Sequence, residues 1–206
     1  MSAISSIQNF LGITPTATTA PTTSVTPTAS TTTVQPMATD QYQASTGSMP
    51  NAQNVPLYYL FNDPAKPQHP LNQKLLQRLN WFGIDTSEEY LKAASTPFKR
   101  SMMSMLSGVF LSSNDRNYIK YQINSWASQA DLLRTGVDLT TARLMQVSGV
   151  IDTPSLARYG NPIDKGVIYA AMAANCLQYG YRMPSFGEVS SAVEKAKLLP
   201  PKIYWY

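Results

Sequence analysis

The sequence predicts an all-α domain preceded by a disordered or extended N-terminal tail. Three observations support this fold class. Residues that favour helix N-caps recur directly before Pro, or three residues before Glu. Between these starts, apolar residues recur with the period of a helix, and one stretch of the chain repeats another. We therefore expect seven or eight short helices and no sheet.

The tail is low in charge, since Asp40 is the only charged residue before position 60. Residues 14–56 form a linker rich in Thr, Pro and Ala, a composition that favours extended conformations and buries too little apolar surface to fold. Ahead of it, residues 1–13 form a short amphipathic segment that is too short to hold a helix alone. We interpret this segment as a tethered docking peptide, the alternative being an inert terminus. Its proposed partner-binding residues are Ile4, Ile7, Phe10 and Leu11.

The compartment is predicted from what the chain lacks. No run of 18 apolar residues could span a membrane, and residues 1–14 lack the basic start of a signal peptide. Cys176 is the only cysteine, so it cannot form an internal disulfide. We expect a cytoplasmic protein.

Residues 57–70 are an aromatic and Pro-rich lead-in, in which Leu57–Phe61 either packs on the domain or anchors a neighbour. A helical domain is expected over residues 71–199. Its first helix carries Leu75, Leu76, Leu79 and Phe82, and a central helix carries Ile119, Ile123, Trp126, Ala127, Ala130 and Leu133. Helix starts are predicted at the capping boxes Thr86–Glu89 and Ser185–Glu188, at Asp138, and at Thr96-Pro97, Thr153-Pro154 and Asn161-Pro162.

The internal repeat aligns residues 79–97 with residues 145–162, with one insertion. Each unit reads as a helix ended by Gly83 or Gly149, a tight turn whose Thr caps a second helix, and a third helix begun by Pro97 or Pro162. Helices this short cannot bury their faces alone. We therefore expect the two units to share one core around Trp126.

Several motifs in this order resemble an uncharacterised bacterial family, number 4332 among domains of unknown function. They are Ala130–Val137, Ala142–Met145, Gly149–Thr153, Leu156-Ala157, Asn161-Pro162, Arg182–Ser185, Val189 and Ala196–Leu198. The resemblance covers about residues 71–199 and implies a compact, tandem helix-hairpin-helix-like module. It brings no established activity.

Helix-hairpin-helix modules usually bind DNA through backbone N–H groups in a hairpin that contains two Gly residues. Here Gly136-Val137-Asp138 puts a carboxylate at the second Gly position, and His69–Asn72 lacks Gly in the first unit. The domain nevertheless carries 16 basic residues against 11 acidic ones once Asp40 is set aside. Sequence-independent nucleic-acid binding is the alternative function, with a predicted footprint of Lys99, Arg100, Arg134 and Arg143.

The inventory of reactive side chains is poor. His69 is the one residue that titrates near neutral pH unperturbed, and Cys176 lies in an apolar helical stretch typical of a buried small side chain. We expect no catalytic residues, cofactor or metal. The methionines of 102–106 (Met102, Met103 and Met105, beside Leu106) are interpreted chiefly as core filling, the alternative being an adaptable binding surface.

The chain ends with an aromatic peptide, residues 200–206, after Pro200-Pro201 stops the last helix. It either folds back on its own domain or inserts into a partner, and we favour the partner because the Pro pair projects it away. The proposed partner-binding residues are Ile203, Tyr204, Trp205 and Tyr206. The leading hypothesis is a non-enzymatic structural or adaptor protein that binds other subunits of an assembly, or copies of itself, through its two ends.

Overall fold

A computed structural model describes residues 54–106 and 112–206, and in this part of the chain the fold is all-α, as predicted. Nine helices lie there: α3 (Leu57–Phe61), α4 (Pro70–Trp81), α5 (Ser87–Ala93), α6 (Pro97–Leu106), α7 (Ser113–Leu133), α8 (Leu139–Val147), α9 (Thr153–Ala157), α10 (Pro162–Tyr179) and α11 (Phe186–Leu198). Their number exceeds the seven or eight expected. With 21 and 18 residues, α7 and α10 are also longer than expected.

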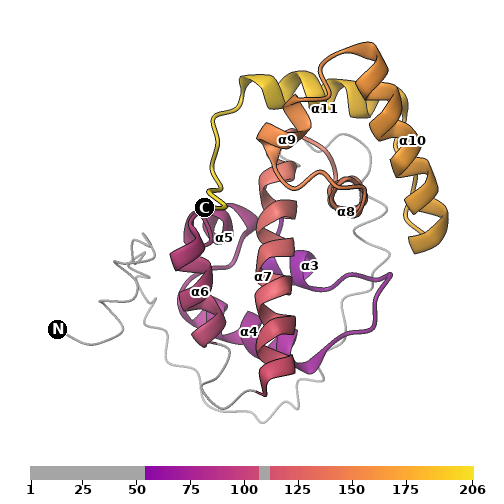
Figure 1. Cartoon of the computed structure of the whole chain (residues 1–206). Coiled ribbons are helices and arrows are strands. Elements are labelled where there is room, and N and C mark those ends of the chain that lie inside the picture. Colours follow the sequence, from indigo (N-terminus) through magenta and orange to yellow (C-terminus); the bar gives the residue numbers. More distant parts are fainter. Residues whose placement is uncertain (1–53, 107–111) are drawn as a thin grey trace, which may run out of the picture.

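The repeat predicted from the sequence is visible as two units of the same order. Unit 1 comprises α4, α5 and α6, and unit 2 comprises α8, α9 and α10; α7 runs between the two groups of helices (Figure 1). Both first helices end in the same way. Ile84 N–H donates to Leu79 O at 3.0 Å and Val150 N–H donates to Met145 O at 3.0 Å, around Gly83 and Gly149.

These two glycines explain why the units repeat at this point. Gly83 has φ 76° and Gly149 has φ 95°, a left-handed conformation that closes the C-terminus of a helix at little steric cost only for Gly. The residue after each glycine, Ile84 or Val150, is fully buried. Each turn therefore reverses the chain and pins it to the core.

Most predicted helix starts are confirmed. The Thr86–Glu89 and Ser185–Glu188 capping boxes are both formed, and Asn161 accepts from Asp164 N–H at 2.8 Å. The prediction at Thr153 is wrong by one residue, since Asp152 is the N-cap of α9. Thr153 instead donates its N–H and its hydroxyl to Asp131 of α7, at 2.8 and 2.9 Å. Its side chain therefore joins α9 to α7 and does not cap α9.

One continuous core joins the units, as expected from the repeat. Trp126 of α7 is buried in it and stacks on Phe61 of α3, with ring centroids 3.6 Å apart. All six apolar residues predicted to face the core from the central helix are buried: Ile119, Ile123, Trp126, Ala127, Ala130 and Leu133.

The predicted domain limits of 71 and 199 are too narrow. Val55, Leu57 and Phe61 belong to the core at one end, and Ile203 belongs to it at the other. The backbone of Val55 pairs with Ser87, since Ser87 N–H donates to Val55 O at 2.8 Å and Val55 N–H donates to Ser87 Oγ at 3.0 Å. The lead-in and the C-terminal peptide are thus parts of the folded domain, and so is Val55, which had been assigned to the linker predicted over 14–56.

Candidate functional site

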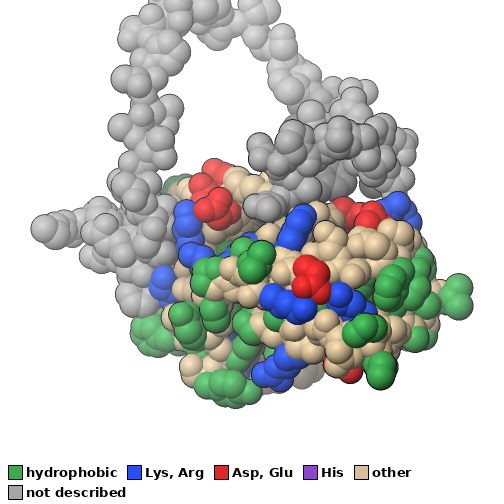
Figure 2. Space-filling view, turned by 90° about the horizontal axis from the view of Figure 1, so that it is seen from above, with side chains coloured by type: hydrophobic (Ala, Val, Ile, Leu, Met, Phe, Trp, Pro, Cys, Tyr) green, Lys and Arg blue, Asp and Glu red, His purple; other side chains and the backbone are tan. Residues whose placement is uncertain are grey.

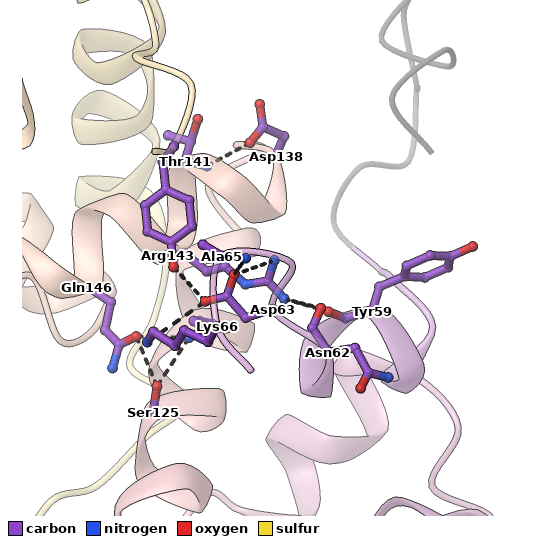
Figure 3. Close-up of polar contacts among 12 residues, drawn as sticks. Tyr59, Asn62, Asp63, Ala65, Lys66, Ser125, Asp138, Thr141, Arg143 and Gln146 are labelled. Carbon is purple, nitrogen blue, oxygen red and sulfur yellow. Dashed lines mark hydrogen bonds and ion pairs between the residues drawn. The ribbon is translucent and has the colours of Figure 1, made fainter. Parts of the chain in front are cut away.

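A partly buried ionic network centred on Asp63 joins three segments of the domain (Figure 3). Arg143 of α8 reaches the Asp63 carboxylate, with Nη1 3.7 Å from Oδ1. The same guanidinium donates to the carbonyls of Tyr59 and Asn62, at 2.6 and 3.0 Å, at the C-terminal end of α3. From the loop before α11, Tyr181 Oη donates to Asp63 Oδ2 at 2.5 Å.

The electrostatics of this network suit a structural role. Burial raises the pKa of Tyr181 well above its ordinary value, and the hydrogen bond to Asp63 and the charge of that carboxylate raise it further. A phenol held neutral in this way is a poor base or nucleophile at neutral pH. The network therefore ties α3, α8 and the loop before α11 together.

A small cavity lies beside this network, between the α3–α4 loop, α7 and α8. Its volume of about 40 Å³ has room for one or two waters. Ser125 and Gln129 line the cavity, and their Oγ and Nε2 donate to Gln146 Oε1 at 3.0 and 2.9 Å.

The predicted nucleic-acid footprint is wrong for its arginines. Arg100 and Arg143 are only 6% and 4% exposed, and Arg134 is paired with Asp131 at 2.5 Å and donates to Pro200 O at 2.8 Å. Lys99 is half-buried and donates to Lys92 O at 3.2 Å. These guanidinium groups satisfy carbonyls and carboxylates of the chain itself, so they cannot form an outward-facing patch.

In the hairpin between α7 and α8, the N-terminus of α8 is capped by a side chain of the protein itself. Gly136 has φ 82°, and Asp138 Oδ1 accepts from Thr141 N–H at 2.7 Å, which confirms the predicted cap. Arg182 also pairs with the Asp138 carboxylate at 3.5 Å. A phosphate would have to displace this carboxylate from the helix N-terminus.

The C-terminal peptide folds back on its own domain, so the prediction that it inserts into a partner is wrong for Ile203 and Trp205. Tyr204 N–H donates to Ser95 O of unit 1 at 2.8 Å, and Trp205 Nε1 donates to Asp152 Oδ2 of unit 2 at 2.7 Å. Arg100 lies 4.6 Å from the Trp205 ring and donates to Tyr204 O at 2.9 Å. Burial lowers the pKa of Arg100, while its interaction with Tyr90 raises it.

The peptide therefore straps the two units together. At the start of the peptide, Arg134 donates a hydrogen bond to the carbonyl of Pro200. This contact fixes the Pro pair so that the following residues run along the domain. Ile203 is buried, whereas the side chains of Tyr204 and Tyr206 stay exposed.

The other residues singled out in the sequence have local roles, where they are described. His69 caps α4, with Nδ1 accepting from Leu71 N–H at 3.3 Å, and Cys176 is half-buried, with Sγ donating to Tyr181 O at 2.6 Å. Met103 fills the core as predicted, but Met105 is exposed. The remaining residues predicted to bind a partner, Ile4, Ile7, Phe10 and Leu11, lie outside the described residues.

The sequence interpretation missed an apolar surface on α10. We call it the α10 outer face, and it consists of Ile163, Val167, Ala170, Ala174 and Leu177. All five are exposed, with Ile163, Val167 and Leu177 at 79%, 59% and 89%. They lie opposite the buried Ile168 and Met172 on the helix. Apolar side chains gather along the right-hand edge of the space-filling view, on the side where Figure 1 shows α10 (Figure 2).

The equivalent positions of α6 are also apolar, and two of the three are exposed. Phe98, Met102 and Met105 follow Pro97 at the spacing with which Ile163, Val167 and Ala170 follow Pro162. Phe98 and Met105 are 63% and 61% exposed, while Met103, like Ile168, is buried. The spacing of 4, 3, 4 and 3 residues on α10 was available in the sequence as a signal.

Comparisons of the chain with protein-family models, with curated proteins and with solved structures find no match. In the described part of the chain, no helix combines the length and apolar character needed to cross a membrane. Nor do three or more His, Cys, Asp or Glu side chains come together there as ligands for a metal ion.

Proposed function

We propose that this chain is a non-enzymatic structural or adaptor subunit that binds other protein subunits through the α10 outer face and through residues 1–13. The observation that carries the proposal is the α10 outer face itself. Three large aliphatic side chains, Ile163, Val167 and Leu177, are mostly in solvent on a helix whose other face is in the core. Covering each of them is worth about 1–2.5 kcal/mol.

The composition of α10 supports a protein partner. Between Gly166 and Tyr179 the helix carries no charged residue, whereas the fully buried centre of a protein interface is typically depleted in charge. An isolated exposed Leu would need no explanation, but a continuous apolar stripe along a helix of 18 residues does.

The use of the charged side chains supports a non-enzymatic role. The most deeply buried ions, Asp131 and Arg143, hold α9 and α3 in place. His69 caps a helix, and Tyr181 is held neutral by its burial and by its hydrogen bond to Asp63. We also propose that the chain is a helix-hairpin-helix-like module of the family it resembles, in which the occupied hairpin at Asp138 argues against DNA binding.

Affinity purification of the full-length protein from its native host tests this function. The extract is treated with nuclease and the captured material is washed with high salt before analysis. Apolar contacts survive the wash, whereas phosphate contacts weaken steeply with salt. Retained protein subunits are expected. Recovery of nucleic acid alone, lost on the wash, would contradict the proposal and favour sequence-independent nucleic-acid binding.

A further inference from the structure

We propose that the surface on which residues 200–206 lie is a recognition site for an extended peptide of another protein. We call this surface the strap site, and it consists of Ser95, Arg100 and Asp152. The peptide that fits it carries an aliphatic residue two positions before a Trp, as this chain does at Ile203 and Trp205. Residues 200–206 then act as an internal competitor, which a peptide that binds more tightly displaces. The strap site is separate from the α10 outer face and does not depend on it.

The strap site binds the backbone of the peptide. Ser95 O accepts from Tyr204 N–H at 2.8 Å, and Arg100 Nη2 donates to Tyr204 O at 2.9 Å, so both polar backbone groups of Tyr204 are bound. Burial alternates along the peptide: Ile203 is buried, Tyr204 exposed, Trp205 half-buried and Tyr206 exposed, which is the period of an extended chain. Main-chain hydrogen bonds combined with contacts to alternate side chains are a general way of recognising extended peptides.

The contacts with Trp205 make the site selective. Its Nε1 donates to Asp152 Oδ2 at 2.7 Å, and the Arg100 guanidinium lies 4.6 Å from the centre of its ring. Asp152 and Arg100 are only 7% and 6% exposed, and they come from unit 2 and unit 1. Any other apolar side chain at this position would leave the buried Asp152 oxygen without its donor, which is costly for an ionised group. The strap site therefore favours Trp.

The internal peptide leaves apolar surface beside the strap site uncovered. Phe98 follows Ser95 by three residues and is 63% exposed, and Ile151 directly precedes Asp152 and is 47% exposed. A peptide of another protein that also covers these side chains gains contacts that residues 200–206 do not make. The same segment of a second copy gains none, and it competes with an internal peptide at an effective concentration of about 1 mM. These observations favour a peptide of another protein.

Fluorescence anisotropy with a labelled peptide of residues 201–206 tests the site. The protein is the full-length chain with Ile203→Ser and Trp205→Ala, which removes the internal competitor and which we call the freed variant. Its circular dichroism and melting are first compared with those of the wild type. We expect a Kd of about 30 μM for the freed variant and about 30-fold weaker binding to the wild type, because about 1 mM of internal peptide competes. The same peptide with Trp205→Phe should bind at least about tenfold more weakly, since it lacks the indole N–H.

Two substitutions added to the freed variant form a matched pair, Asp152→Asn and Asp138→Asn. Both carboxylates cap a helix, but Asp152 also bonds to Trp205, whereas Asp138 bonds to Thr141 and Arg182. Asn can cap a helix as Asp does, so both variants are compatible with the fold. We expect Asp152→Asn to weaken peptide binding by about tenfold and Asp138→Asn to leave it unchanged.

Four results would overturn the proposal: no binding by a folded freed variant, equal binding by the freed variant and the wild type, equal binding of a peptide of scrambled sequence, or equal effects of the two Asp substitutions. If the freed variant does not fold, full-length Trp205→Phe replaces it. This variant should bind the peptide about tenfold more tightly than the wild type, and equal affinities would overturn the proposal.

A wild-type dimer that the peptide dissociates would overturn the proposal in favour of an exchange of residues 200–206 between copies. Failure of the peptide to bind would leave the proposed function standing, since that function rests on the α10 outer face.

Discussion

The indole N–H of Trp205 offers a sharp test of the C-terminal strap. Nε1 donates to Asp152 Oδ2 at 2.7 Å, while Oδ1 of the same carboxylate caps α9 by accepting from Ser155 N–H at 2.7 Å. Replacing Trp205 with Phe removes this donor, keeps an aromatic ring beside Arg100 and leaves the cap of α9 intact.

The expected loss follows from the chemistry of that bond. A hydrogen bond to an ionised group contributes about 1.5–3 kcal/mol, and Asp152 is buried, so water replaces the indole poorly. We expect Trp205→Phe to lower the free energy of unfolding by about 2 kcal/mol. With a urea dependence of about 2 kcal/mol per molar, the midpoint should fall by about 1 M with an unchanged slope.

The assay is urea unfolding followed by circular dichroism, with Tyr206→Phe as the matched control. The Tyr206 side chain is fully exposed, so its variant should stay within about 0.5 kcal/mol of the wild type. Equal midpoints for Trp205→Phe and the wild type would show that the strap is not seated in solution, and would restore the prediction that these aromatics serve a partner.

Three further outcomes are expected. Gly149→Ala should destabilise by about 1–2 kcal/mol because its φ of 95° is strained for any L side chain, while Gly166→Ala in α10 should stabilise slightly; thermal melting compares them. Tyr181 has a raised pKa, so its contribution is complete below about pH 10 and is lost as the pH rises further. Urea titrations from pH 9 to 11 should show a shallower loss for Tyr181→Phe than for the wild type, and equal slopes would contradict this. The pKa of Glu188 is lowered by the backbone N–H of Ser185, so its contribution is present above about pH 4.5 and is lost as the pH falls. Glu188→Gln should flatten that acid limb in urea titrations from pH 7 to 3, and an unchanged limb would contradict the assignment.

The local elements of the fold could be predicted from the sequence because their causes are local. A cap at Asn161 or Ser185 needs only residues three positions away, and the turns at Gly83 and Gly149 need only a residue that tolerates positive φ. The shared core could be predicted from the same patterns. Apolar residues recur with a helical period on the one helix that contains Trp126, and this helix had to pack against both units.

The long-range polar contacts could not be predicted in this way. Arg100 bonds to the carbonyl of Tyr204 and Arg143 to that of Tyr59, and every residue offers a carbonyl, so the sequence carries no signal for the choice. An arginine in the sequence looks the same whether it faces phosphate or the end of a helix. The interpretation of Arg100, Arg134 and Arg143 as parts of a footprint failed for this reason.

The apolar character of the outward side of α10 could be predicted from the sequence, but its exposure to solvent could not. From the sequence alone, Val167 could be a buried core residue or an exposed one, because the side of the helix on which the core lies is not known. The core lies on the side of Ile168 and Met172, and this placement turns the α10 outer face to the solvent.

The central claim is that outward apolar faces bind protein subunits, and the most direct test compares what two full-length proteins retain from the native host. One is the wild type and the other carries Val167→Glu and Leu177→Glu, two exposed positions where a charge leaves the core untouched. Both are purified identically, after matching circular dichroism and melting. We predict that protein subunits remain with the wild type and are lost from the variant. Retention of the same subunits by both would contradict the claim.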